Sequence, residues 1–104
     1  MALTREYRET VIRRLKEDRE FTAAVFSEAI SAFVEGDKTT TLSIPRDLVH
    51  AHISFKVLSK QTGFDEKGLH RMLSIRGNPT TENLSTLLHT IEKDLELKLE
   101  VKAK

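Results

Sequence analysis

Cysteine and tryptophan are absent from the 104 residues of this chain, which hold only four glycines and two prolines. Without cysteine there is no disulfide framework, no thiolate zinc site and no cysteine nucleophile. No apolar run approaches the roughly 20 residues that a membrane-spanning helix needs. The glycines, at positions 36, 63, 68 and 77, are scattered, so no glycine-rich phosphate loop is present. One hydrophobic core must therefore hold the fold together.

The composition is that of a folded domain, with 38% hydrophobic and 32% charged residues. A chain of 104 residues suits one domain with one core. The first residues contain no apolar signal segment. We expect a cytoplasmic protein that has no contact with membranes and lies on the nucleoid when it is bound to DNA.

No pattern of catalytic residues is visible. His50 and His52 are two positions apart, so on a helix they point to different faces, and no pair of histidines has metal-ligand spacing. Ser59 and Ser85 lack the strand-turn-helix context of a nucleophile elbow. We expect no enzymatic activity, no metal and no cofactor.

Charge is distributed unevenly. Residues 1–37 carry 6 basic and 8 acidic groups, residues 38–90 carry 7 and 4 together with all four histidines, and residues 91–104 carry 4 and 4. The central excess suits contact with phosphates. Random scatter of charges also accounts for an imbalance of this size.

Apolar spacing predicts two helices near the N-terminus. The first spans residues 5–16 with Thr4 as its cap, and the second spans 19–34 after Asp18, a good N-cap, and before Gly36, a typical helix stop. Three aromatic side chains of the second helix are expected in core or dimer packing rather than in a ligand box: Phe21, Phe26 and Phe33.

Residues 38–44 are rich in threonine and predict a loop or a short extended segment, followed by a helix that begins at Pro45. At the other end, Leu95, Leu97, Leu99 and Val101 alternate with charged residues, which predicts a strand over 95–103. A lone strand needs a partner for its backbone. The partner is either the 39–44 segment or the same strand of a second subunit, and we favour the dimer.

Residues 55–91 have the spacing of a DNA-binding helix-turn-helix. The pattern predicts helices over 55–62 and 65–73 separated by Gly63, which supplies a positive φ, and a third helix over 82–91 after a break at 77–80. Ser59 is small where the two helices cross, and Asp65 is placed to cap the second helix. A wedge of apolar residues sets the angle between the helices: Leu58, Phe64, Leu69 and Met72.

The second of these helices would then turn polar residues outward. Arg71 suits guanine, Lys67 suits guanine or a phosphate, and Glu66 suits a cytosine amino group. An ordinary solvated helix face is the competing interpretation. Gly68 inside this helix lets the backbone approach DNA or a neighbour closely, and the sequence does not choose between them. The full predicted DNA-contact set is Ser54, Lys56, Lys60, Asp65, Glu66, Lys67, His70, Arg71, Arg76, Asn78 and Thr80.

These residues carry a family resemblance. The chain resembles the Xre, or lambda-repressor-like, helix-turn-helix family, and more narrowly the HigA-like antitoxins. The similarity rests on residues 46–48, on Phe55 with 58–59, on 62–63 and 67–73, and on 77–80 with 83–84. The chain departs from that pattern at Gly68, at 39–45 in place of a helical stretch, and in its regular terminal strand.

The resemblance implies a bacterial repressor of its own operon that neutralises a toxin, often a small RelE-like nuclease. We therefore expect a mainly α domain of five to six helices over residues 1–104: a helical pair over 1–37, a helix-turn-helix core over 46–94, and a C-terminal dimerisation strand over 95–103. The expected partners are an operator in double-stranded DNA, a second copy of the chain and such a toxin. The alternative is a protein-binding inhibitor with little DNA binding of its own.

Overall fold

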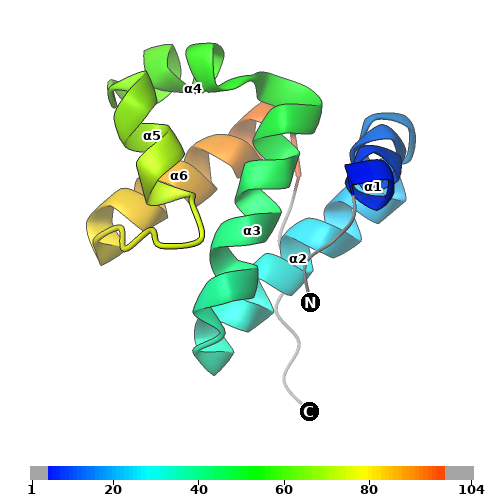
Figure 1. Ribbon diagram of the computed structural model, residues 1–104, viewed down its shortest axis with the longest axis horizontal. Helices are drawn as coiled ribbons and strands as arrows, with labels where there is room; N and C mark the ends of the chain where they lie inside the picture. Colours follow the sequence, from blue (N-terminus) through cyan, green and yellow to red (C-terminus); the bar gives the residue numbers. More distant parts are fainter. Residues whose placement is uncertain (1–4, 98–104) are drawn as a thin grey trace.

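The computed structural model describes residues 5–97, which are mainly α-helical, as predicted (Figure 1). In Figure 1, α4 and α5 form one side of the molecule, α1 lies on the opposite side, and α6 crosses behind α3 and α5. In chain order the elements are α1 (Arg5–Glu17), α2 (Arg19–Glu35), α3 (Lys38–Leu48), the π-helical turn η1 (Val49–Ile53), α4 (Phe55–Thr62), α5 (Glu66–Met72) and α6 (Thr81–Asp94).

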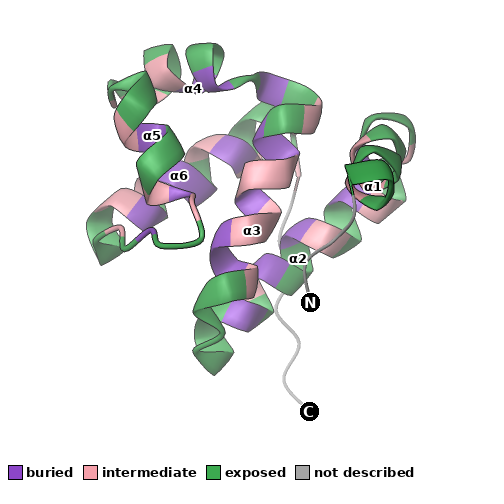
Figure 2. Ribbon diagram, in the orientation of Figure 1, coloured by how far each residue is buried: buried purple, intermediate pink, exposed green. Residues whose placement is uncertain are grey.

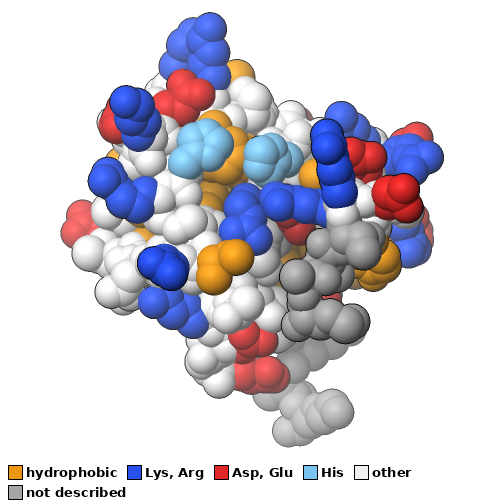
Figure 3. All heavy atoms as spheres, in the orientation of Figure 1, with side chains coloured by type: hydrophobic (Ala, Val, Ile, Leu, Met, Phe, Trp, Pro, Cys, Tyr) orange, Lys and Arg blue, Asp and Glu red, His pale blue; other side chains and the backbone are white. Residues whose placement is uncertain are grey.

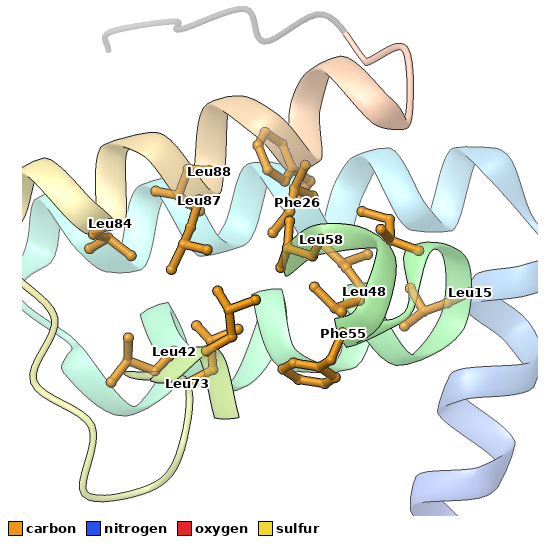
Figure 4. Packing of buried hydrophobic residues seen from close by; sticks show 14 residues of the cluster. Leu15, Phe26, Leu42, Leu48, Phe55, Leu58, Leu73, Leu84, Leu87 and Leu88 are labelled. Carbon is orange, nitrogen blue, oxygen red and sulfur yellow. The ribbon is translucent and has the colours of Figure 1, made fainter. Parts of the chain in front are cut away.

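One buried cluster joins these helices. It runs from Leu15 of α1 to Ile91 of α6 and includes Leu48, Leu58 and Leu69, none of which contacts solvent appreciably. Buried positions recur along α3, which lies near the middle of the fold (Figure 2). Figure 4 shows side chains of several helices directed into this shared interior. Burial of apolar area is the main favourable contribution to folding, so the N-terminal helices and helices α4 to α6 stabilise one another.

The two N-terminal helices agree with the predicted ones to within one residue at their C-terminal ends, because α1 ends at Glu17 and α2 at Glu35. Thr4, the predicted cap of the first helix, lies outside the described residues. The carboxylate of Asp18 accepts a hydrogen bond from the Phe21 amide, and Gly36 adopts a left-handed φ of 82°. Core packing is confirmed for two of the three aromatic residues, because Phe26 is buried and Phe21 packs partly buried against the core. Phe33 is 45% exposed, and its alternative role in dimer packing stays a prediction.

The predicted loop at 38–44 is wrong, because these residues form the first part of α3. Asp37 starts the helix: its carboxylate accepts from the Thr40 amide at 3.1 Å and from the Thr40 hydroxyl at 2.7 Å. These hydrogen bonds lower the pKa of Asp37. The Thr41 hydroxyl donates to the Asp37 carbonyl, so the threonines find partners within the helical turn.

Pro45 is likewise not the first residue of a helix, as predicted, but lies inside α3. A proline there lacks an amide donor and crowds the carbonyl four residues before it, which costs about 3 kcal/mol. Its neighbours Leu42 and Leu48 are buried together with it. Burial of these side chains in the tertiary structure therefore offsets the cost of a proline inside a helix, from which the sequence alone predicts a helix boundary. Leu48, Val49 and Ile53, further along the same helical stretch, are also buried.

The predicted C-terminal strand is wrong over its described part. Leu95 ends α6, Glu96 has a left-handed φ of 54°, and the Leu97 amide donates to the Glu92 carbonyl at 3.0 Å. This is a Schellman-type helix end, in which the residue after the left-handed position returns to the apolar face. Leu95 and Leu97 accordingly pack against the core of their own chain. Leu99 and Val101, the other two predicted dimer residues, lie outside the described residues.

Candidate nucleic-acid interface

Two short helices joined by a tight turn, α4 and α5, lie at the positions predicted for the helix-turn-helix. Gly63 ends α4 with φ 80°, and its amide donates to the Ser59 carbonyl at 2.8 Å. Ser59, predicted to be small for the helix crossing, also donates its hydroxyl to the Phe64 carbonyl across the turn. In the predicted wedge Leu58 and Leu69 are fully buried, while Phe64 and Met72 are half-buried against the core. The angle between α4 and α5 is therefore set by interior contacts.

The outer side of α5 is polar. Glu66, Lys67, His70 and Arg71 are exposed, whereas Leu69 is buried. Asp65 occupies the N-cap position of α5, as predicted. Its side chain makes no capping hydrogen bond, so the predicted capping interaction is wrong. All five predicted contact residues of this segment thus share one accessible surface.

An aromatic stack joins this surface to α4. The His70 ring lies on the buried Phe55 ring with centroids 3.8 Å apart and planes 18° apart. His50 meets the same ring edge-on at 5.1 Å. Phe55 is the first residue of α4, and its chain neighbours Ser54 and Lys56 are exposed. Lys60 is exposed one turn further along α4.

Arg71 extends back along α5. Its Nη2 atom lies 3.9 Å from the position that a Cβ of Gly68 would occupy, and Asp65 Cβ is equally near. The guanidinium is therefore held toward the N-terminal half of the helix. That half is the part of a recognition helix that meets base edges.

The loop between α5 and α6 supplies the remaining predicted contacts. Asn78 accepts a hydrogen bond from Lys38 Nζ at 3.3 Å, and the Thr80 hydroxyl caps α6 by accepting from the Asn83 amide at 3.1 Å. Both predicted phosphate ligands thus have a structural partner. Arg76 is exposed beside them.

Four further polar residues lie next to this surface and were missed by sequence reasoning as contact residues: Arg8, Arg46, Asp47 and His50. Arg46 Nη1 donates to the Leu73 carbonyl at 3.0 Å, and Arg8 Nη2 lies 3.4 Å from Asp47 Oδ1. Burial raises the pKa of Asp47, although nearby Arg8 opposes this, and burial lowers the pKa of His50. Arg8 lies in α1 and His50 in η1, both far in sequence from α5. No sequence pattern links these two residues to the surface of α5.

Basic side chains gather on one face of the molecule. Figure 3 shows Lys and Arg side chains and two histidines spread over α3, α4 and α5, with fewer acidic groups between them.

Across the described residues, no helix is long and apolar enough to cross a membrane. No group of three or more potential metal ligands occurs within residues 5–97.

Comparison with known proteins finds no match to this chain among family models, curated proteins or solved structures.

Replacing Gly68 with alanine should stabilise the protein by up to about 1 kcal/mol, because glycine inside a helix is less favourable than alanine by that amount. A Cβ at position 68 meets nothing nearer than 3.9 Å. Thermal or urea unfolding of both proteins measures the change. A loss of stability would show that the glycine backbone is required at this point of α5.

Ser54 carries backbone strain, with φ 81° and ψ 150°, while its hydroxyl caps α4 by accepting from the Val57 amide at 3.2 Å. Glycine relieves such strain, which costs of order 1–3 kcal/mol, and loses only a few tenths of a kcal/mol as a cap. Ser54→Gly should therefore unfold at a higher urea concentration than the wild type, and Ser54→Ala at a lower one. Equal midpoints for the two variants would contradict this.

Proposed function

We propose that this protein binds double-stranded DNA by placing α5 in the major groove and acts as a transcriptional regulator. The main support for this proposal is the exposed polar side of α5, which carries Lys67 and Arg71. Helix α4 holds α5 in place through the buried wedge and the Phe55–His70 stack. A helix with its side chains is about 10–12 Å across and the major groove is about 12 Å wide, so the two are matched in size.

We further propose that the regulator is the antitoxin of a toxin–antitoxin module and represses its own operon. The support is the resemblance of its helix-turn-helix segment to HigA-like antitoxins. Residues 38–48 are helical, which removes one of the departures from that family pattern. We propose a homodimer on paired half-sites, because two-fold operators match two-fold proteins. Leu95 and Leu97 pack partly buried against their own core and not in a strand, so we propose that the contact between subunits does not use a strand at these two residues.

A gel shift on the DNA immediately upstream of the gene tests the DNA-binding proposal, at low and at physiological salt, with scrambled competitor. We expect a shift that survives competitor, has dimer stoichiometry and weakens steeply with salt, because the free energy gained by releasing counterions falls as the salt concentration rises. A shift that any competitor abolishes would contradict sequence-specific binding. A monomeric complex would contradict the dimer alone.

A second candidate function is binding of a partner protein through α2 and α6. An open apolar groove lies between these helices, lined by Phe26, Ile30, Leu84 and Leu88 among others. Val34 at its edge is 80% exposed. Exposed apolar patches of this kind mark interaction sites.

Co-purification with the product of the neighbouring gene tests the protein-binding candidate. Val34→Glu should abolish capture of the partner and leave DNA binding unchanged, since Val34 lies on α2 rather than in the helix-turn-helix. Retention of the partner by this variant would place the contact elsewhere.

A further inference from the structure

We propose that a hollow beside α5 holds a backbone phosphate of the bound DNA, with Arg8 and Arg76 as its direct ligands. The hollow is lined by Arg8, Arg46, His50, His70, Ser74, Ile75 and Arg76. The inference rests on the proposed DNA-binding function and adds to it a second point of contact, contributed by the N-terminal helix α1.

Three separate segments bring these basic groups together. The first segment is α1, which carries Arg8. The second is α3 with the adjoining η1, which carry Arg46 and His50. The third is α5 with the loop after it, which carry His70 and Arg76. The side chains meet through tertiary contacts, since α1 lies against the turn at the end of α3. The grouping is therefore a property of the folded chain.

The charge of the hollow is strongly positive. Three guanidinium groups line it, and the carboxylate of Asp47, whose side chain is only 19% exposed, lies beside Arg8. Asp47 holds Arg8 at 3.4 Å while the Arg8 side chain remains 42% exposed, so Arg8 is oriented without being withdrawn from solvent. Guanidinium groups bind phosphate oxygens through charge-assisted hydrogen bonds.

Arg46 acts in this hollow as a positioning residue. Its Nη1 atom is tied to the Leu73 carbonyl at the end of α5, and its buried Nε has no hydrogen-bond partner within the described residues. The contact fixes the start of the loop that carries Arg76. The charge of Arg46 adds to the attraction without requiring direct contact with the phosphate.

The position of the hollow favours a DNA phosphate over a free anion. His70 belongs both to the hollow and to the outer face of α5, so the hollow borders the surface that would enter the groove. Phosphate strands flank a major groove that is about 12 Å wide, close to the width of the helix inside it. Ile75 at the hollow is 86% exposed and offers an apolar contact for deoxyribose.

The salt dependence of binding to a short duplex of mixed sequence tests the phosphate contacts without knowledge of the operator. For the double variant Arg8→Gln, Arg76→Gln, the slope of log K against log salt should fall by about 0.9, because the two arginines share one phosphate and each phosphate contact contributes about 0.9. Arg13→Gln is the matched control, since Arg13 is an exposed residue of α1 that does not line the hollow. An unchanged slope in the double variant, or an equal change in the control, overturns the proposal.

Asp47→Asn distinguishes phosphate binding from a merely structural role of the Arg8–Asp47 pair. If the pair only supported the fold, Arg8→Gln and Asp47→Asn would weaken binding alike. A phosphate site predicts opposite effects, because removal of the carboxylate removes repulsion of the phosphate. We expect Asp47→Asn to bind the duplex several-fold more tightly, and weaker binding by both variants overturns the site.

Inorganic phosphate at constant ionic strength separates the two sources of the anion. If titration calorimetry shows that millimolar phosphate binds the wild type and not the double variant, while both proteins have the same salt slope for the duplex, the hollow is a free-anion site and the proposal fails. Competition of phosphate with the duplex in the wild type that is lost in the double variant supports a DNA phosphate in the hollow. Loss of preference for upstream DNA with an intact slope difference would refute sequence-specific regulation while leaving the phosphate site standing.

Discussion

Arg71→Ala should weaken operator binding by about 1–3 kcal/mol, a factor of roughly 5 to 150, and relax the base preference at one position. Arginine reads guanine through paired hydrogen bonds to O6 and N7, which no other base offers in the same arrangement. Arg71 is exposed on the polar side of α5 and directed toward its N-terminal half near Gly68. Anisotropy titrations with operator duplexes substituted at each base pair measure both effects.

Lys56→Ala provides the control for Arg71. Lys56 is exposed on α4 next to the stacked Phe55, where the preceding helix of such a motif crosses the backbone. Its loss should weaken binding by similar amounts on all sequences and reduce the salt slope by about one. If Arg71→Ala behaved in the same way, with its base preference intact, Arg71 would be a phosphate ligand rather than a reader.

Gly77→Ala should destabilise the protein by about 1–3 kcal/mol or more, the range for forcing additional atoms into a filled space. A Cβ at this position would lie 2.1 Å from the Met72 carbonyl oxygen and 2.9 Å from that of Arg71. Backbone atoms cannot rotate away as a side chain can. The chain after α5 must therefore shift, and the 2.9 Å hydrogen bond from the Gly77 amide to Ser74 would be strained.

Urea unfolding measures this loss, and Gly68→Ala is the matched control because it adds the same methyl group within α5 where there is space. The two substitutions should move the unfolding midpoint in opposite directions. DNA affinity should also fall in Gly77→Ala, since the displaced loop carries Arg76 and Asn78. A midpoint equal to that of the wild type would show that the loop accommodates the clash by moving freely.

The elements that could be predicted are those whose cause is local. Asp18, Gly36 and Gly63 lie at helix ends because a short acidic side chain caps amides and glycine accepts a positive φ. The wedge residues Leu58 and Leu69 follow from helical periodicity, which does not depend on distant contacts. The candidate reading face of α5 was visible for the same reason, as the complement of its buried side.

Two predictions failed where local patterns are ambiguous. Threonines and Pro45 argue against a helix over 38–48, yet the burial of Leu42 and Leu48 decides for one. Leu95 and Leu97 alternate as in a strand, but the helix end at Glu96 returns Leu97 to the core. Arg19 of α2 also donates to the Glu96 carbonyl at 3.0 Å, a contact across 77 positions that no sequence pattern contains.

By itself the sequence determined a mainly helical chain, the positions of α4, Gly63 and α5, and which side of α5 is polar, because each depends on spacing within a few turns. Only the tertiary structure decided where the N-terminal helices lie relative to α4 and α5. Arg8 and Asp47 are 39 positions apart and meet because α1 lies against the end of α3. The basic hollow beside α5 is built from such long-range contacts, and their geometry is set by the shared core.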